Sequence, residues 1–253
     1  MRKPIIVKIG GSALAGGALD DLPEILASGT PVALVHGGGQ QLTRMLDALG
    51  LPTEFREGLR VTDEATMAVA EMVFAGEVNK ALVRDLYAIG IPAVGLSGTD
   101  GPTLRVEPVP TLGRVGNVTE VEPYLVETLW TGGFVPVIAP IGFGPEGAYN
   151  VNADSAAAAL AMGLGAGHLF FLTDVDGLLD GDEAVPSLAP EECEGYVERG
   201  LAVGGMVPKL RAAAEAAREG VEARIVNGNR QGSLEKAVAG GLVGTLISEG
   251  VVA

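Results

Sequence analysis

Short apolar segments alternate with amphipathic segments along almost the whole chain, and this alternation limits the possible folds more than any other feature. Apolar, largely β-branched strand candidates lie at residues 5–9, 32–35, 93–96, 135–139, 169–172 and 222–226. Helix-like spacing of apolar residues separates them, at 19–26, 41–49, 64–89, 122–131, 155–163, 190–200, 209–219 and 233–239. Strands that alternate with helices in this way predict an α/β sandwich with a mainly parallel open sheet.

The composition allows a large core, and two irregular stretches suggest how it is divided. Of the 253 residues, 47% are hydrophobic, which suits one domain or two closely joined lobes. The segment GFGPEG, residues 142–147, breaks the alternation after an apolar strand, so we expect lobes at residues 1–145 and 146–253. Residues 98–118 are rich in Gly, Pro and Thr and predict a hairpin excursion, and Gly76 predicts a kink or a break in the longest helix.

Charge and residue usage exclude several classes of function. The formal net charge of −15 opposes binding to nucleic acids or to anionic membranes. No apolar run reaches the roughly 20 residues that span a membrane, and the first residues do not form a secretory signal, so we expect a cytoplasmic protein. Cys193, the single cysteine, has no partner for an internal disulfide, and His36 and His168 are too few for a multi-histidine metal site.

A lysine interrupts the first strand candidate. Residues 5–9, IIVKI, predict a strand buried on both faces, yet Lys8 brings an ammonium group into it. Either this side chain reaches the end of the strand and water, or an anion meets it. Gly10 and Gly11 follow and let the backbone turn with its amides exposed, as phosphate-binding loops require.

A second glycine turn follows the second strand candidate. The sequence HGGGQ places Gly37, Gly38 and Gly39 between that strand and a helix. Exposed amides at a helix N-terminus attract anions, so these glycines predict an anion-binding site, whereas an ordinary turn needs only one glycine. We expect His36 to brace the turn through a hydrogen bond.

Two polar motifs lie in the second half of the chain. NVNAD places Asn150, Asn152 and Asp154 at two-residue intervals before an alanine-rich helix. Helix capping explains one of these residues, and a polar ligand-binding set explains all three. In LTDVDGLLD, Asp174 and Asp176 are either turn formers or groups near a nucleotide or a metal-linked phosphate, because they follow a buried strand.

Two more cations belong to candidate motifs. GGMVPK brings Lys209 to the start of a helix after a glycine turn, although a surface lysine is the ordinary alternative. GLRVT places Arg60 before another helix, where a guanidinium either captures a carboxylate in bidentate fashion or lies at the surface. GFGPEG lacks the helix that a dinucleotide-binding loop requires, and no P-loop motif occurs in the chain.

In their order and spacing, KIGG, HGGGQ, GLRVT, NVNAD, LTDVDGLL and GGMVPK resemble the motifs of the acetylglutamate kinases, within the amino acid kinase superfamily. The resemblance covers essentially the whole chain. KIGG and HGGG are shared with carbamate kinase, glutamate 5-kinase and aspartokinase, whereas GLRVT, NVNAD and GGMVPK are more selective. The resemblance implies a three-layer α/β/α sandwich of the carbamate kinase-like fold, with an N-terminal lobe for the acyl-amino acid and for dimerisation, and a C-terminal lobe for ATP.

The resemblance also implies a role for each motif residue. Lys8 and Lys209 would stabilise the transition state, with Asp154 organising them. The substrate would lie against Gly38, Gly39, Arg60 and Asn150, and phosphate against Gly10, Gly11 and Gly37. The nucleotide would lie along Asp174, Val175, Asp176, Gly177, Leu178, Leu179, Leu201, Ala202 and Val203.

The implied reaction is phosphoryl transfer from ATP to the side-chain carboxylate of N-acetyl-L-glutamate, in arginine biosynthesis. A glutamate side chain in water has a pKa of about 4.3, so this carboxylate is already ionised at neutral pH and needs no general base. The scarcity of candidate His and Cys bases agrees with this chemistry. Mg²⁺ would be held mainly by ATP oxygens and water, so no metal motif is required.

Two details concern regulation and assembly. Thr99 in GLSGTDG stands where relatives often carry lysine, which leaves the role of that loop open. Arginine-inhibited members of the family resemble one another in an extra helix before the first strand, which links dimers into a hexameric ring, whereas this sequence begins at its first strand. We therefore expect a homodimer that arginine does not inhibit, with its interface on the helical stretch 64–89.

Two alternative functions remain open at this stage. One is a kinase for a related carboxylate such as carrier-linked aminoadipate, which the negative net charge disfavours because the carrier is acidic. The other is a non-catalytic regulator that binds amino acids or nucleotides on the same fold. The presence of Lys8, Lys209 and Asp154 disfavours it.

Overall fold

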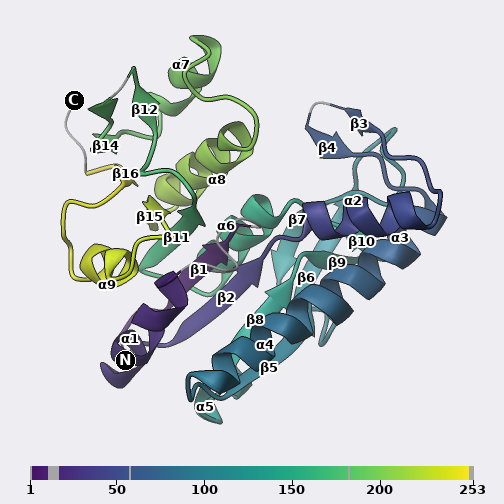
Figure 1. The fold of residues 1–253 in the computed structure, drawn as a ribbon, viewed down its shortest axis with the longest axis horizontal. Coiled ribbons are helices and arrows are strands. Elements are labelled where there is room, and N and C mark those ends of the chain that lie inside the picture. Colours follow the sequence, from purple (N-terminus) through teal and green to yellow (C-terminus); the bar gives the residue numbers. More distant parts are fainter. Residues whose placement is uncertain (1, 11–16, 57, 182, 251–253) are drawn as a thin grey trace.

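A computed structural model describes residues 2–10, 17–56, 58–181 and 183–250 of the chain. In this part of the chain, an eight-stranded open sheet runs through the molecule (Figure 1). In spatial order its strands are β14 (Ser187–Leu188), β16 (Thr245–Ile247), β15 (Glu222–Asn227), β11 (His168–Thr173), β1 (Ile5–Ile9), β2 (Val32–His36), β8 (Val135–Ala139) and β5 (Ala93–Ser97). Neighbouring strands pair in parallel, except that β15 and β16 are antiparallel. All six strand candidates are confirmed, with ends within one residue.

Helices cover both faces of this sheet, which confirms the α/β/α sandwich. One face packs against α1 (Leu22–Ala27), α4 (Asn79–Ala88) and α9 (Ser233–Val238). The other face packs against α5 (Tyr124–Thr131), α6 (Ala153–Gly163) and α8 (Met206–Arg218).

The central strand β1 contributes to both layers. Successive side chains of a strand point to opposite faces, so Ile5, Val7 and Ile9 belong to the core under α1, α4 and α9, and Ile6 to the core under α6 and α8. Lys8 lies two residues after Ile6 and therefore points to the same face of the strand. The strand period therefore directs its ammonium group toward the face covered by α6 and α8.

The longest helical stretch contains a π-helix. α3 (Glu64–Glu71) continues into η3 (Met72–Val78), a π-helix of seven residues, and then into α4. The irregularity expected at Gly76 is present, but it widens the helix and does not break its hydrogen bonding. None of the helices in the described ranges is long and apolar enough to cross a membrane.

A four-stranded sheet stands beside the main one. Its spatial order is β10 (Gly147–Asn150), β9 (Ile141–Gly144), β6 (Leu104–Pro108) and β7 (Gly116–Val121). The antiparallel pair of β6 and β7 confirms the predicted excursion, and GFGPEG forms the hairpin of β9 and β10. The predicted lobe boundary after residue 145 falls in the turn of that hairpin, and the division into two lobes stays a prediction.

Smaller elements complete the described chain. They are η2 (Gly17–Asp21), α2 (Gly39–Ala48), the hairpin of β3 (Phe55–Arg56) and β4 (Leu59–Arg60), the hairpin of β12 (Leu179–Asp180) and β13 (Glu183–Ala184), and α7 (Cys193–Glu198). Three of the motifs singled out in the sequence, KIGG, HGGGQ and LTDVDGLL, lie at the carboxyl ends of β1, β2 and β11, where ligands bind in open parallel sheets.

Candidate active site

Three charged side chains from distant segments meet near the carboxyl end of β1. Lys8 Nζ lies 2.8 Å from Asp154 Oδ1, and Lys209 Nζ lies 3.0 Å from the same oxygen. Asp154 comes from the first turn of α6 and Lys209 from the first turn of α8. Of the two interpretations of Lys8, the anion partner is confirmed, and that anion is Asp154.

This cluster is buried and carries one positive charge in excess. Each of the three side chains is only 8% exposed. Burial by itself would raise the pKa of the Asp154 carboxyl, but Lys8 and Lys209 outweigh it and hold that pKa below its usual value. Burial lowers the pKa of Lys209, and Asp154 opposes this shift. Two ammonium groups that share one carboxylate leave a cationic point suited to an incoming anion.

The motif NVNAD gives its three polar residues separate roles. Asn152 Oδ1 caps α6 by accepting hydrogen bonds from the backbone N–H of Asp154 at 2.9 Å and of Ser155 at 3.1 Å. Asn150 Nδ2 donates to Thr62 Oγ1 at 3.1 Å. The three side chains do not share one side of an extended segment, because α6 begins within the motif and turns Asp154 toward the lysines.

The glycine turns differ in which amides they leave free. Gly10 N–H donates to Leu172 O at 3.1 Å, and Gly37 N–H donates to Ile9 O at 3.0 Å, so both amides belong to the sheet. In this conformation neither N–H can bind a phosphate, and the phosphate-binding role of these two glycines stays a prediction. Gly11 lies outside the described residues.

Gly38 and Gly39 form the N-terminus of α2. Gly38 has a φ of 156°, and a Cβ there would lie 2.9 Å from the ring of Phe74, so both the backbone and the space favour glycine. Within the described ranges, neither N–H donates to a protein acceptor. These two amides and the helix dipole are therefore free to meet an anion, and the anion-binding role predicted from HGGGQ stays a prediction.

Arg60 lies beside this turn and is 8% exposed. Its Nη2 donates to Thr43 Oγ1 at 2.7 Å and to Gly39 O at 3.2 Å, and its Nη1 donates to Thr53 Oγ1 at 3.3 Å. The guanidinium carbon also lies 4.7 Å from the centre of the Phe55 ring. All these hydrogen-bond partners are neutral, and Asp47 acts on Arg60 only through charge, so the guanidinium can still hydrogen-bond an incoming carboxylate.

Two cavities meet at the charged cluster. A cavity of about 210 Å³ is lined by the four predicted substrate residues, Gly38, Gly39, Arg60 and Asn150, together with Gly37, Lys8 and Asp154. A cavity of about 480 Å³ is lined by most of the predicted nucleotide residues together with the cluster, namely Lys8, Asp154, Lys209, Asp174, Val175, Gly177, Leu178, Leu179, Leu201 and Val203. Lys8 and Asp154 line both cavities and so lie at their junction.

Two of the predicted nucleotide residues do not line the larger cavity. Asp176 accepts hydrogen bonds from Asn227 Nδ2 at 2.7 Å and from Arg230 Nη2 at 2.5 Å, which ties it to the loop after β15. Ala202 is buried beneath the cavity wall, with 2% of its surface exposed. A contact between either side chain and a nucleotide stays a prediction.

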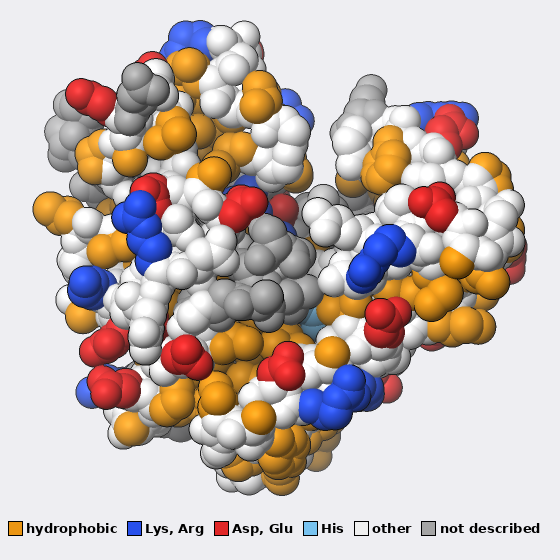
Figure 2. Space-filling view, viewed as in Figure 1, with side chains coloured by type: hydrophobic (Ala, Val, Ile, Leu, Met, Phe, Trp, Pro, Cys, Tyr) orange, Lys and Arg blue, Asp and Glu red, His pale blue; other side chains and the backbone are white. Residues whose placement is uncertain are grey.

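The molecule is hollowed beside this junction. Figure 2 shows an opening between the part that carries α7 and α8 and the part that carries α2 and the β3–β4 hairpin. A cleft of about 610 Å³ lies between Gly58 and Leu59 of that hairpin and Gly204 and Gly205 before α8. It shares Gly58 and Leu59 with the smaller cavity, which therefore opens into it.

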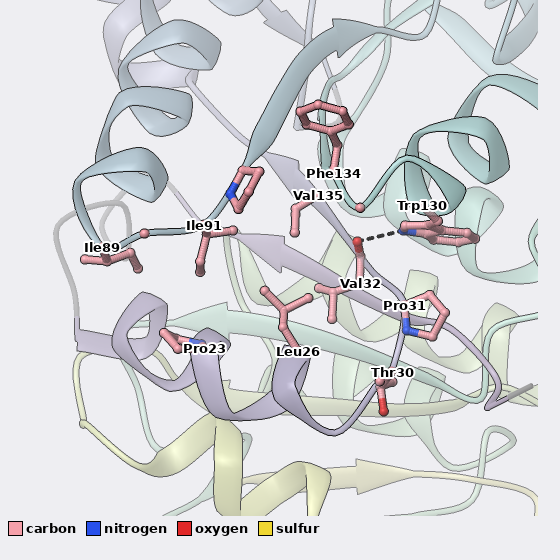
Figure 3. A pocket seen from close by; sticks show the side chains of 14 residues that line it. Pro23, Leu26, Thr30, Pro31, Val32, Ile89, Ile91, Trp130, Phe134 and Val135 are labelled. Atoms are coloured by element: carbon pink, nitrogen blue, oxygen red, sulfur yellow. Dashed lines mark hydrogen bonds between the residues drawn. The ribbon is translucent and has the colours of Figure 1, made fainter.

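A separate hollow lies at the amino ends of β2, β5 and β8, at the opposite edge of the sheet (Figure 3). Its volume is about 430 Å³, and apolar side chains such as Leu26, Ile89 and Phe134 line it. Trp130 Nε1 donates to Val32 O at 2.8 Å, so the indole is already paired. No charged side chain from the described ranges lines this hollow, which sets it apart from the cluster of Lys8.

The sequence patterns did not point to two residues that support the site through hydrogen bonds. Asn79 is fully buried and contacts His36, and Thr62 receives the hydrogen bond of Asn150. A signal for Asn79 existed, because it shares a helical face with Leu82 and puts an amide where the apolar spacing expects a core residue. The predicted bracing role of His36 is confirmed by its contact of 2.7 Å with Gly37 O.

The α/β/α fold, with two lysines and a free helix N-terminus at the carboxyl ends of its strands, fits the class of phosphotransferases. The chain belongs to the amino acid kinase family, whose family model matches residues 3–227. The acetylglutamate kinase of Rubrobacter xylanophilus is 69% identical over 247 residues, covering 98% of each chain, which confirms the resemblance seen in the motifs.

Solved structures agree with this assignment. The protein smu.665 from Streptococcus mutans superimposes with a TM-score of 0.88 at 27% identity, covering 98% of this chain and all of that one. The N-acetylglutamate synthase of Neisseria gonorrhoeae, in complex with coenzyme A and N-acetyl-glutamate, gives a TM-score of 0.85 at 26% identity, covering all of this chain and 61% of that one.

Proposed function

We propose that this chain transfers the γ-phosphoryl group of ATP to the side-chain carboxylate of N-acetyl-L-glutamate, giving N-acetyl-L-glutamyl 5-phosphate in the second step of arginine biosynthesis. The observation that carries the proposal is the junction of two cavities at Lys8 and Asp154, one beside Arg60 and one beside Lys209. The 69% identity to an acetylglutamate kinase supports the choice of substrate.

The smaller cavity suits an acyl-amino acid with two carboxylates. Arg60 would hold the α-carboxylate, because its guanidinium is buried and its hydrogen-bond partners within the described ranges are neutral. Asn150 would bind the acylated amino group or a carboxylate oxygen from the opposite wall. The side-chain carboxylate would then lie near Gly38 and Gly39 at the N-terminus of α2, close to Lys8.

The larger cavity would hold ATP with its triphosphate toward the lysines. Asp174, Leu178 and Leu179 follow β11, and Leu201 and Val203 precede α8, so the nucleotide would lie across the ends of these elements. Its terminal phosphate would then face the carboxylate across the junction of the two cavities.

The residues of the site would act by neutralising negative charge, because the carboxylate nucleophile is already ionised and no proton has to be removed from it. A carboxylate that attacks a triphosphate must overcome the repulsion of two anions, and charge spreads over the equatorial oxygens in the transition state. Lys8 and Lys209 would neutralise that charge from two sides, while Asp154 holds both ammonium groups in place. The N–H groups of Gly38 and Gly39 would add fixed dipoles at the acceptor carboxylate.

The side chains of the site fit a magnesium ion that the nucleotide brings with it, because they leave most of its coordination to other ligands. No group of three or more His, Cys, Asp and Glu side chains in the described ranges could hold a metal, and Asp154 is already paired with two cations. Oxygens of ATP and water would therefore supply most ligands. When bound, the ion would neutralise part of the triphosphate charge and orient the terminal phosphate.

Trapping the acyl phosphate as a hydroxamate tests the proposal. We expect ATP-dependent hydroxamate with N-acetyl-L-glutamate and little with glutamate, aspartate or aminoadipate. Turnover of aminoadipate attached to a carrier protein in place of N-acetyl-L-glutamate would point to the related carboxylate kinase. Tight binding of ATP or N-acetyl-L-glutamate with no acyl phosphate from any acceptor would point to a non-catalytic regulator.

We also propose that two copies of the chain associate through α2 and the long helix of α3, η3 and α4. Apolar side chains on these elements are exposed, among them Leu49, Met72 and Tyr87 with 58%, 70% and 54% of their surfaces free. Light scattering is expected to give the mass of a dimer, and Met72→Glu is expected to shift it toward the monomer. A monomeric parent protein would contradict this assembly.

A further inference from the structure

A buried polar contact links the π-helix region to the glycine turn. Asn79, the first residue after η3, and His36, the last residue of β2, are both fully buried. Asn79 Nδ2 lies 3.1 Å from His36 Nε2 and 2.9 Å from Val137 O, and His36 Nδ1 lies 2.7 Å from Gly37 O. The contact reaches from the helix to the first peptide of the HGGG turn.

The hydrogen-bond partners determine the orientation of the Asn79 amide. Its Nδ2 faces Val137 O, which can only accept, and its Oδ1 accepts from Lys80 Nζ at 2.9 Å. A flipped amide would bring its oxygen against that carbonyl and its NH₂ group against the ammonium. The side chain of Asn79 therefore presents an N–H donor to His36, whose Nε2 at 3.1 Å lies nearer to Nδ2 than the remaining acceptor, Leu96 O at 3.4 Å.

The tautomer of His36 follows from this donor. An amide NH₂ only donates, so His36 Nε2 must accept, and the single proton of the neutral ring lies on Nδ1. That proton is donated to Gly37 O. Burial lowers the pKa of His36 to about 4, and Lys80 acts in the same direction, so the ring is neutral near pH 7.

Both backbone polar groups of Gly37, its N–H and its carbonyl, are thereby occupied. Its N–H donates to Ile9 O at 3.0 Å, and its carbonyl accepts from His36. The following residue, Gly38, packs against Phe74 and Val78 of the π-helix, at 2.9 Å and 3.3 Å from where its Cβ would stand. The turn is thus held by the hydrogen bond to Ile9 of β1, by His36 and by the π-helix.

We propose that Asn79 is a positioning residue for the reaction: it fixes the Nδ1–H form of His36, and so holds the Gly37 peptide with the N–H groups of Gly38 and Gly39 directed at the reacting carboxylate. The catalytic consequence rests on the proposed function, whereas the tautomer can be observed without turnover. The proposed tautomer and the proposed catalytic function can therefore be refuted independently of each other.

Imidazole nitrogen NMR tests the tautomer directly. The chain has only two histidines, His36 and His168, so protein labelled with ¹⁵N-histidine gives two sets of signals, and His168→Asn assigns them. We expect His36 to keep a protonated Nδ1 and a bare Nε2 between about pH 5.5 and pH 8.5. An Nε2–H tautomer or an imidazolium in this range would overturn the proposal, whatever the protein phosphorylates.

The variant Asn79→Asp tests the catalytic consequence, because it keeps the shape but replaces the donor with an acceptor. A carboxylate at position 79 draws a proton onto His36 Nε2 and raises the pKa of the ring, while Lys80, the charged group that acts on His36, opposes the rise. Below that pKa both ring nitrogens carry protons and Gly37 O keeps its donor. Above it the single proton moves to Nε2, and a bare Nδ1 faces Gly37 O at 2.7 Å.

The expected result is a pH dependence that loss of stability alone would not produce. At high pH the kcat of Asn79→Asp should fall about 10- to 100-fold below the parent, since loss of one aligned oxyanion donor costs about 10²- to 10³-fold and a displaced donor costs less. As the pH falls through the raised pKa of His36, kcat should recover toward the parent value. The KM for N-acetyl-L-glutamate and ATP should stay within about threefold, because the loss concerns the transition state.

A matched control separates this effect from a general loosening of α4. Lys80→Met removes the cation on the other side of the Asn79 amide and leaves the donor to His36 intact, so kcat should stay within about threefold of the parent with an unchanged pH profile. Melting temperatures establish that each variant is folded at the assay temperature. A pH profile of Asn79→Asp parallel to that of the parent would overturn the positioning role.

Discussion

The carboxylate of Asp154 is the group whose removal tests the site most directly. Lys8 Nζ and Lys209 Nζ lie 2.8 Å and 3.0 Å from its Oδ1, so the two ammonium groups are less than about 6 Å apart. Asp154→Asn keeps the shape and removes the negative charge. At an effective dielectric constant of about 20, two unit charges about 6 Å apart repel by about 3 kcal/mol.

That repulsion is large enough to remove one cation from the site. Either a lysine loses its proton or the two ammonium groups separate, and Lys209 is the more susceptible because burial already lowers its pKa. A loss of about 3 kcal/mol of transition-state stabilisation lowers kcat about 100-fold. The KM for ATP should not rise, because the variant removes a negative charge beside a polyanion.

The sign of the pH dependence distinguishes this mechanism from simple damage. In the variant, an unpaired lysine has a pKa below its unfolded value, so kcat should fall as the pH rises through the lowered pKa. Over the same range the folded state loses its penalty for burying the charge, so the melting temperature should rise relative to the parent.

The hydroxamate assay and thermal unfolding, both as a function of pH, measure these quantities. Glu219→Gln at the exposed end of α8 makes the same change in net charge and serves as the control. A variant Asp154→Asn that keeps more than about a tenth of the parental kcat, with a parental pH profile, would refute the reasoning.

Three further predictions concern other parts of the structure. Arg60→Lys should raise the KM for N-acetyl-L-glutamate about tenfold, because a point charge replaces a bidentate donor, and leave the KM for ATP within about twofold in steady-state kinetics. Gly38→Ala puts a Cβ 2.9 Å from the Phe74 ring and should lower the melting temperature by about 5 °C, whereas Gly39→Ala meets nothing within 4 Å and should change it little. Cys193 is buried, and burial raises the pKa of its thiol to about 11, so iodoacetamide at about pH 8 should label it only after unfolding, as mass spectrometry can show.

Each of these inferences has an opposite result that contradicts it. An unchanged KM for N-acetyl-L-glutamate in Arg60→Lys would remove this arginine from substrate binding. Equal melting temperatures for the two alanine variants would mean that the contact of Gly38 with Phe74 is relaxed in solution. Complete labelling of Cys193 in the native protein would mean that α7 opens readily.

Most strands of the main sheet could be predicted from local sequence patterns. The strands β2, β8 and β11 carry nearly continuous apolar runs, and β1 does so apart from Lys8, because helices cover both faces of the sheet, and such runs mark parallel strands. The short strands β9 and β10 were missed, since they carry few β-branched residues and pair with each other, with β6 and, at Asn150, with Val115. The π-helix was not foreseen as such, because the sequence pattern pointed only to an irregularity at Gly76.

Local sequence patterns predicted only part of the candidate site. Lys8 was conspicuous because a charge in a buried strand is costly, and Gly37 to Gly39 because a simple turn does not need three glycines. The partner of Lys8 could not be derived from local patterns. Asp154 follows it by almost 150 residues, and its direction is set by the start of α6 within NVNAD.

Local sequence patterns were enough to predict the layers of the fold, the positions of the two glycine turns and the need of Lys8 for an anion, because these follow from strand period, backbone freedom and the cost of a buried charge. The folded chain was needed to show which amides remain free, which carboxylate joins the two lysines, and which donor fixes the proton on His36. Those outcomes depend on distances between segments far apart in the chain, and hydrogen bonds and ion pairs form only where folding brings such groups within about 3 Å.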